Sequence, residues 1–71
     1  MRRGDNVLVR VYPNGTVERI VWDERNTYIM CCRREIYEDA IARGVEPEST
    51  MGFPKEDVKL AKNQAAMSSV P

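Results

Sequence analysis

The sequence contains no histidine, only two cysteines and no long apolar run. Without histidine, the chain lacks the commonest general base and the commonest protein ligand for metals. A membrane-spanning helix needs about 18 consecutive apolar residues, which no segment supplies. The basic start, residues 1–3, is not followed by the apolar core of a signal peptide. These absences predict a small cytoplasmic protein with no membrane segment, metal or cofactor.

Net charge is also absent, because eleven Lys and Arg balance eleven Asp and Glu in 71 residues. The chain therefore lacks the strong positive field that drives non-specific binding to phosphates. A single core in so short a chain rarely leaves more than ~3–5 kcal/mol of net stability. Either the core is efficient or a second copy of the chain completes it. We expect one domain over residues 1–60 and a flexible tail over 61–71, which shows no periodicity.

Two strands joined by a tight turn open the chain. Residues 5–12 alternate Val with other side chains, which is typical of a strand with one buried face. Asn14 and Gly15 tolerate the positive φ of a hairpin turn. A second strand should run over residues 16–22, where the alternation is imperfect. A bulge near residues 18–19, or burial of both faces at the strand end, would explain this.

A third strand and a helix follow a polar loop at residues 23–26. Residues 27–32 carry no charge and favour a central strand, so the three strands predict an antiparallel meander. Residues 33–43 change to helical periodicity, with one apolar stripe formed by Ile36, Tyr37, Ala40 and Ile41. Gly44 is a typical left-handed stop.

The two ends of the chain carry a family resemblance. Residues 52–60 read Gly-Phe-Pro-Lys-Glu-Asp-Val-Lys-Leu, and residues 4–9 read Gly-Asp-Asn-Val-Leu-Val. They resemble the closing element and the first strand of Src-homology-3-like barrels, in which an aromatic residue and a proline open a short 3₁₀ turn before a strand that begins with a buried valine. Asp57 stands where the peptide-binding members have a groove tyrosine, their Ala-Leu-Tyr-Asp-Tyr segment is missing, and a helix replaces a short loop. The resemblance therefore implies the fold and not polyproline binding.

The predicted fold is mainly β: a small Src-homology-3-like antiparallel barrel of four to five strands with one α-helix inserted before the last strand. In this interpretation the helix packs over an open end of the barrel. The alternative is an α+β fold, a three- to four-stranded antiparallel meander with one helix packed on a face. The expected core consists of Val7, Val9, Val11, Val17, Ile20, Trp22, Ile29, Cys31, Ile36, Ile41, Phe53 and Val58.

Catalytic groups are not evident. Cys31 and Cys32 are neighbours on a strand, so their sulfurs should point to opposite faces and cannot act together. No histidine activates either thiol, and burial in an apolar strand raises a thiol pKa. Two thiols with scattered carboxylates are not a tetrahedral metal site. The carboxylates lie on a helix face, in loops or in turns, where solvated charge is normal. We therefore expect no enzymatic activity.

Basic and aromatic side chains on the strands are the remaining candidates. Arg10 shares a strand face with Tyr12, as in small barrels that stack nucleic-acid bases. The simpler alternative is a cross-strand ion pair between Arg10 and Glu18. Trp22 is either part of the core or a ligand platform. The candidate partner-binding residues are Arg10, Tyr12, Arg19, Trp22 and Tyr28.

Two functions are compatible with these residues. The first is a non-enzymatic interaction module that binds a protein partner, or a second copy of itself, through strand edges and exposed aromatic residues. The second is a weak nucleic-acid-binding barrel that uses the basic first hairpin, namely Arg2, Arg3, Arg10, Tyr12 and Arg19. The balanced charge favours the first.

Overall fold

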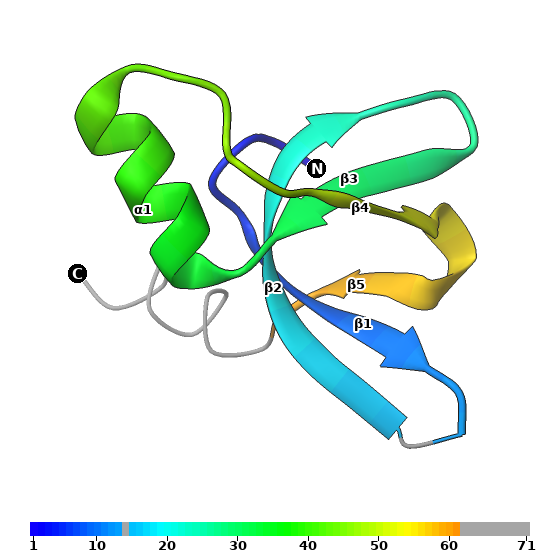
Figure 1. The fold of residues 1–71 in the computed structure, drawn as a ribbon. Coiled ribbons are helices and arrows are strands. Elements are labelled where there is room, and N and C mark those ends of the chain that lie inside the picture. Colours follow the sequence, from blue (N-terminus) through cyan, green and yellow to red (C-terminus); the bar gives the residue numbers. More distant parts are fainter. Residues whose placement is uncertain (14, 62–71) are drawn as a thin grey trace, which may run out of the picture.

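The computed structural model describes residues 1–13 and 15–61. Five antiparallel strands form one sheet that curls into a half-barrel, with the strand order β4-β3-β2-β1-β5 (Figure 1). A single helix stands to one side of the sheet. The elements are β1 (Asn6–Val11), β2 (Gly15–Glu24), β3 (Tyr28–Cys32), α1 (Arg34–Arg43), β4 (Met51–Pro54), the 3₁₀ turn η1 (Lys55–Asp57) and β5 (Val58–Leu60).

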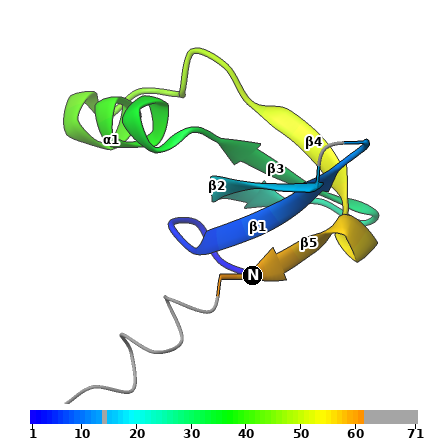
Figure 2. The same cartoon turned by 90° about the horizontal axis from the view of Figure 1, so that it is seen from below.

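The first hairpin has the predicted alternation. Val7 and Val9 of β1 are fully buried, and Val9 lies opposite Val17 of β2. Gly15 has a φ of +99°, a backbone conformation that residues with a side chain rarely adopt. This explains the glycine at the start of β2. Asn14, the other predicted turn residue, lies outside the described residues. The curl of the hairpin over the rest of the sheet is clear in Figure 2.

The predicted ion pair between Arg10 and Glu18 is wrong. The register of the hairpin places Arg10 opposite Thr16 and Glu18 opposite Leu8. The guanidinium group of Arg10 instead donates a hydrogen bond to the hydroxyl of Tyr12 on its own face of the strand.

Strand β2 is buried on both faces near its end, which was one of the two predicted explanations for its imperfect alternation. Ile20 and Val21 are consecutive and both are buried. The ladder with β1 is regular, and the register shifts instead between Val21 and Asp23, opposite β3. The bulge therefore falls at Trp22 and not at residues 18–19. Trp22 follows the core residue Val21 on the strand, and successive side chains of a strand point to opposite faces. Its side chain is half-buried and lies outside the core, so the prediction of Trp22 as a core residue is wrong.

The core lies inside the curl of the sheet. Its buried members come from four strands, and they are Val7, Val9, Val21, Ile29, Cys31 and Val58. Three predicted core residues, Val11, Val17 and Phe53, pack against it while only partly buried. The prediction missed several buried residues, namely Val21, Cys32, Ala40 and Ala61.

Helix α1 begins and ends close to the predicted limits, and Gly44 ends it with a φ of +67°. The helix packs against β2. Only Ala40 of the predicted apolar stripe is buried, and Ile36 and Tyr37 are half-buried. The prediction of Ile41 as a core residue is wrong, because its side chain is 52% exposed. Helical periodicity marks the stripe, whereas the docking angle decides which part of the stripe reaches the sheet.

The closing segment forms two strands joined by a 3₁₀ turn. Phe53 of β4 lies opposite Ile29 of β3, and Val58 of β5 lies opposite Val9 of β1. The predicted return of the chain to the first strand is therefore confirmed, as is the mainly β architecture with one inserted helix. Ala61, expected as the first tail residue, is buried, and its N–H donates to the carbonyl of Asn6. The rest of the predicted flexible tail, residues 62–71, lies outside the described residues.

Replacing Phe53 with alanine should destabilise the protein by about 2 kcal/mol. A fully buried phenylalanine costs ~3–5 kcal/mol on truncation, and Phe53 is only partly buried against the core. Urea unfolding followed by the fluorescence of Trp22 measures the change. Lys55→Ala, in the adjoining turn, is the control and should leave the midpoint nearly unchanged, because its ion pair with Glu24 is exposed. Equal midpoints for the two variants would contradict the assignment of Phe53 to the closure of the sheet.

Candidate functional site: the Trp22 groove

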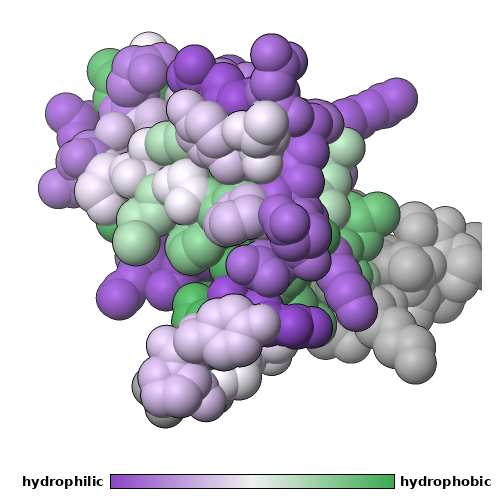
Figure 3. Space-filling model, turned by 90° about the vertical axis from the view of Figure 1, so that its right-hand side faces the viewer, coloured by the Kyte–Doolittle hydropathy of each residue, from purple (hydrophilic) through white to green (hydrophobic). Residues whose placement is uncertain are grey.

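The five candidate partner-binding residues do not form one site. Arg10 and Tyr12 lie together near the β1–β2 turn, where a guanidinium nitrogen of Arg10 is 2.9 Å from the Tyr12 hydroxyl. The guanidinium carbon is 5.8 Å from the centre of the Tyr12 ring. Tyr12 is 74% exposed, so this pair is a surface feature. The face that carries the strand turns is largely hydrophilic, with hydrophobic residues visible between the polar ones (Figure 3).

Tyr28 of β3 lies opposite Pro54 of β4. A Cβ atom at Gly52 would be 2.8 Å from the Tyr28 ring. The ring therefore lies against the backbone of β4, and glycine is required there because any side chain would displace it. Tyr28 thus has a packing role, although its side chain remains partly exposed.

Trp22 is at the centre of a cluster that joins the chain's start to the helix. The guanidinium carbon of Arg3 lies 3.9 Å from the centre of the Trp22 ring, and Arg3 Nε donates to the Trp22 carbonyl at 2.8 Å. On another side, the Tyr37 ring meets Trp22 edge-to-face with 6.1 Å between centroids. Gly4 fits here because a Cβ atom would be 2.9 Å from the Tyr37 hydroxyl. Trp22 is therefore contacted on two sides, by a cation–π contact and by an aromatic pair.

Two adjoining cavities border Trp22. The larger, of about 600 Å³, lies between β2 and the end of α1, and the smaller, of about 340 Å³, continues over the β2 bulge. Arg3, Trp22 and Glu46 line both. We call this surface the Trp22 groove and define it by Arg3, Trp22, Ala40, Ile41, Val45 and Glu46.

The apolar half of the Trp22 groove was not predicted. Ile41 and Val45 are 52% and 45% exposed, and both line the larger cavity. Ile41 was predicted to be a core residue, and Val45 was not among the predicted site residues. The sequence signal for these two residues is an apolar side chain before and after Gly44, the residue that ends the helix. The same spacing is also compatible with two side chains that are simply buried in the core.

Arg19 lies elsewhere, beside the start of α1. Its side chain is half-buried, and one guanidinium nitrogen donates to the carbonyl of Glu18 at 2.7 Å. It borders a cavity of about 270 Å³ together with Arg33 and Arg34. The structure thus separates Arg19 from Arg10, although the sequence places both on the basic first hairpin.

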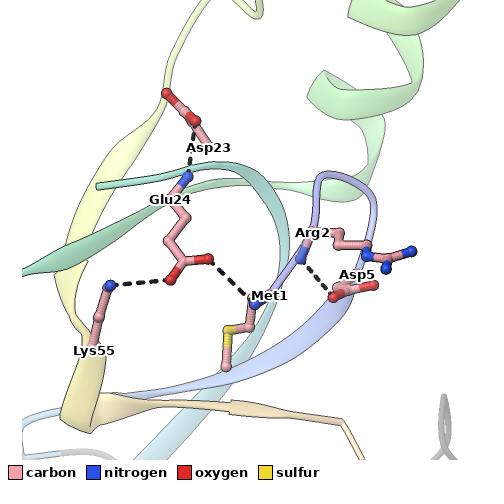
Figure 4. A network of polar contacts seen from close by, with 6 residues as sticks. All are labelled: Met1, Arg2, Asp5, Asp23, Glu24 and Lys55. Atoms are coloured by element: carbon pink, nitrogen blue, oxygen red, sulfur yellow. Dashed lines mark hydrogen bonds and ion pairs between the residues drawn. The ribbon is translucent and has the colours of Figure 1, made fainter. Parts of the chain in front are cut away.

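An exposed polar network surrounds Glu24 at the end of β2 (Figure 4). Its carboxylate forms ion pairs with Lys55 Nζ at 3.0 Å and with the amino group of Met1 at 3.3 Å. The hydrogen bond from Lys55, and then that from the amino group, lower the pKa of Glu24. The network connects the chain's start, β2 and η1.

The two thiols are buried and stay protonated. Cys31 is part of the core, whereas Cys32 lies opposite Ile20, outside the core cluster. Burial, and then the neighbouring Cys32, raise the pKa of Cys31 to about 11. Burial also raises the pKa of Cys32. Since the thiolate is the nucleophilic form, neither cysteine is poised for covalent chemistry near neutral pH.

Comparisons with protein-family models, curated proteins and solved structures found no match to this chain. Within residues 1–13 and 15–61, no group of three or more Cys, Asp or Glu could hold a metal ion. Over the same residues, no helix is long and apolar enough to cross a bilayer.

Thiol labelling should be slow in the native protein. At pH 8 a thiol with a pKa of about 11 has a thiolate fraction roughly two-hundredfold below that of an unfolded thiol with its usual pKa near 8.5. Reaction with a disulfide reagent should therefore be far slower at Cys31 in the native protein than in urea, with Cys32→Ala used to isolate its signal. The raised pKa also means that stability falls between about pH 8.5 and 11, because the unfolded thiol loses its proton first. A native rate equal to the rate in urea would contradict the burial of Cys31.

Proposed function

We propose that this protein is a non-enzymatic interaction module that binds a peptide segment of a protein partner in the Trp22 groove. The observation that carries this proposal is a tryptophan that is contacted by Arg3 and Tyr37 and lines a concave surface together with apolar and charged residues. Tryptophan, tyrosine and arginine dominate the binding energy of protein interfaces, and they do so where side chains are already held in place. The protonated state of both thiols supports a role without covalent catalysis.

The chemistry of the groove favours an acidic peptide with an apolar anchor. Ala40, Ile41 and Val45 line the larger cavity and suit an aliphatic or aromatic side chain. Arg3 stacks on Trp22, and it forms no ion pair with a carboxylate of the described residues. A carboxylate on the peptide, next to the anchor, would meet this guanidinium group with bidentate geometry.

The strand edges are less suited to binding a partner. The edge strands β4 and β5 have four and three residues, and β4 contains Pro54 at its end. Short edges and proline limit the number of main-chain hydrogen bonds that an added strand can form. The groove, in contrast, offers side-chain contacts that do not depend on strand length.

We also propose that the half-barrel belongs to the Src-homology-3-like barrels. The strand order, the 3₁₀ turn η1 between the last two strands and the pairing of Val58 with Val9 support this assignment. Asp57 and the inserted helix α1 depart from the peptide-binding members. The Trp22 groove includes residues of that helix, so the proposed binding surface is not their polyproline groove.

Binding can be measured with short peptides that carry a leucine anchor flanked by glutamate, because Trp22 is the sole tryptophan and reports on the groove by fluorescence. Ile41→Gln should raise Kd by about tenfold or more, since burying an isoleucine side chain is worth ~1.5–3 kcal/mol. Ala42→Gln, at the next exposed helix position outside the groove, should leave Kd unchanged. Peptides with lysine in place of glutamate should bind more weakly.

Three results would contradict the proposal: no fluorescence response with any peptide, equal affinity for the glutamate and lysine peptides, or equal loss in both variants. Sedimentation equilibrium adds a separate check. A dimer that is lost in Ile41→Gln would identify a second copy of the chain as the occupant of the groove.

Nucleic-acid binding is a second candidate function, and the contact between Arg10 and Tyr12 favours it. An exposed aromatic ring beside a guanidinium group is a typical stacking platform for single-stranded bases. The zero net charge opposes it, because affinity for polyanions depends on counterion release.

Titration with single-stranded oligonucleotides at about 50 and 200 mM salt separates the two functions. If the groove is the functional surface, oligonucleotide binding should be weaker than ~10⁻⁴ M at the higher salt, the weak end of non-specific affinities. Micromolar binding that falls steeply with salt and is lost in Arg10→Ala, but kept in Arg25→Ala, would replace the peptide proposal with the nucleic-acid function. Arg25 is a suitable control because it is exposed and paired with Asp23.

A further inference from the structure

A cavity lined by three arginines lies between the hairpin and the first turn of α1. Its volume is about 270 Å³. We call it the arginine cavity, and its lining residues are Asn6, Glu18, Arg19, Ile20, Arg33, Arg34 and Glu35.

None of the three arginines forms an ion pair with a carboxylate of the described residues. Arg19 donates to a backbone carbonyl, and Arg34 donates to the Asn6 side-chain oxygen at 3.0 Å. By contrast, Arg25 and Arg43, outside the cavity, each form an ion pair with an aspartate. Three guanidinium groups around one concave surface repel one another, and an anion with several oxygens relieves that repulsion through charge-assisted hydrogen bonds.

The start of α1 adds to the positive potential of this cavity. The helix begins at Arg34, a lining residue, and Arg33 at the N-cap position provides no side-chain hydrogen bond to the first turn. The helix dipole places partial positive charge at this end. Glu18 and Glu35 offset part of the arginine charge, which disfavours extended polyanions that bind through charge alone.

A second cavity adjoins the arginine cavity and is more apolar. Its volume is about 300 Å³, and it shares Arg19, Arg33 and Glu35 with the first. Ile36 and Met51 are among its other lining residues. An anionic group in the first cavity can therefore be attached to an organic group in the second.

We propose that the arginine cavity binds the phosphoryl group of a small phosphate monoester, whose organic part lies in the adjoining cavity. A phosphoryl group has the three outward oxygens that several guanidinium groups can share, and a single carboxylate does not. The arginine cavity is distinct from the Trp22 groove, because it shares no lining residue with either cavity of the groove. The adjoining apolar cavity shares Thr50 with the smaller cavity of the groove.

Isothermal titration with inorganic phosphate and with phenyl phosphate at low salt tests the site, and backbone amide shifts locate it. Arg33→Gln combined with Arg34→Gln should weaken both ligands at least tenfold. Arg43→Gln, on the same helix but at its other end, should change Kd by less than twofold. Ile41→Gln should also leave phosphate binding unchanged, so failure of the groove and failure of this site are distinguishable.

Tighter binding of phenyl phosphate, with amide shifts at Ile36 and Met51, supports the monoester. Equal affinities with shifts confined to Arg33, Arg34 and Ile20 support the phosphoryl site and identify free phosphate as its ligand. The proposal is overturned if neither ligand binds at ~20 mM, or if the wild-type shifts lie away from these amides. Undiminished affinity in the double arginine variant also overturns it. The shifts are measured on the wild-type protein, so the test holds even if the double variant fails to fold.

Discussion

Burial of β2 on both faces is the constraint on which the other features of this structure depend. Val21 packs into the curl of the sheet, and its neighbour Ile20 is buried outside the core cluster, on the strand that α1 packs against. A strand presents successive side chains to opposite faces, so both faces must be covered if two consecutive apolar residues are to leave water. The curled sheet covers one face of β2. The helix is therefore a requirement of this strand and not an appendage to the barrel.

The same constraint creates both proposed binding surfaces. Trp22 lies at the bulge directly after Val21, and its ring contacts Arg3 from the chain's start and Tyr37 of the helix. One residue before Ile20, Arg19 borders the cavity at the beginning of α1. The groove thus lies toward one end of the helix and the arginine cavity toward the other, and β2 contributes to both.

Apolar contacts across β1 connect the two ends of the sheet's core. Val9 is flanked by Val17 on one side and Val58 on the other, so the first strand joins the beginning and the end of the described fold. Exposed ion pairs such as those around Glu24 contribute little in comparison, because solvent screens them. The ion pairs of charged residues therefore link neighbouring segments at the surface, whereas the packing of the valines stabilises the sheet.

The amino-acid sequence alone indicated where the first three strands and the helix lie, whereas β4 was not predicted as a strand. The return of Val58 to the first strand was predicted from the family resemblance of residues 52–60 and not from periodicity. Alternating valines mark β1, a change of period marks α1, and Gly44 ends the helix. These features depend on neighbours in the chain, whose side-chain directions are set by backbone geometry. The periodicity of α1 likewise predicted an apolar stripe.

Only the tertiary structure decided which parts of that stripe are buried and which side chains converge. Ala40 reaches the sheet and Ile41 does not, because the docking of α1 on β2 selects one side of the stripe. The convergence of Arg19 with Arg33, and of Trp22 with Arg3, brings together residues from different elements. Such proximity depends on the curl and the bulge of the sheet, and no local pattern encodes it. A local sequence pattern predicts the direction of a side chain, but it does not predict which distant residue that side chain contacts.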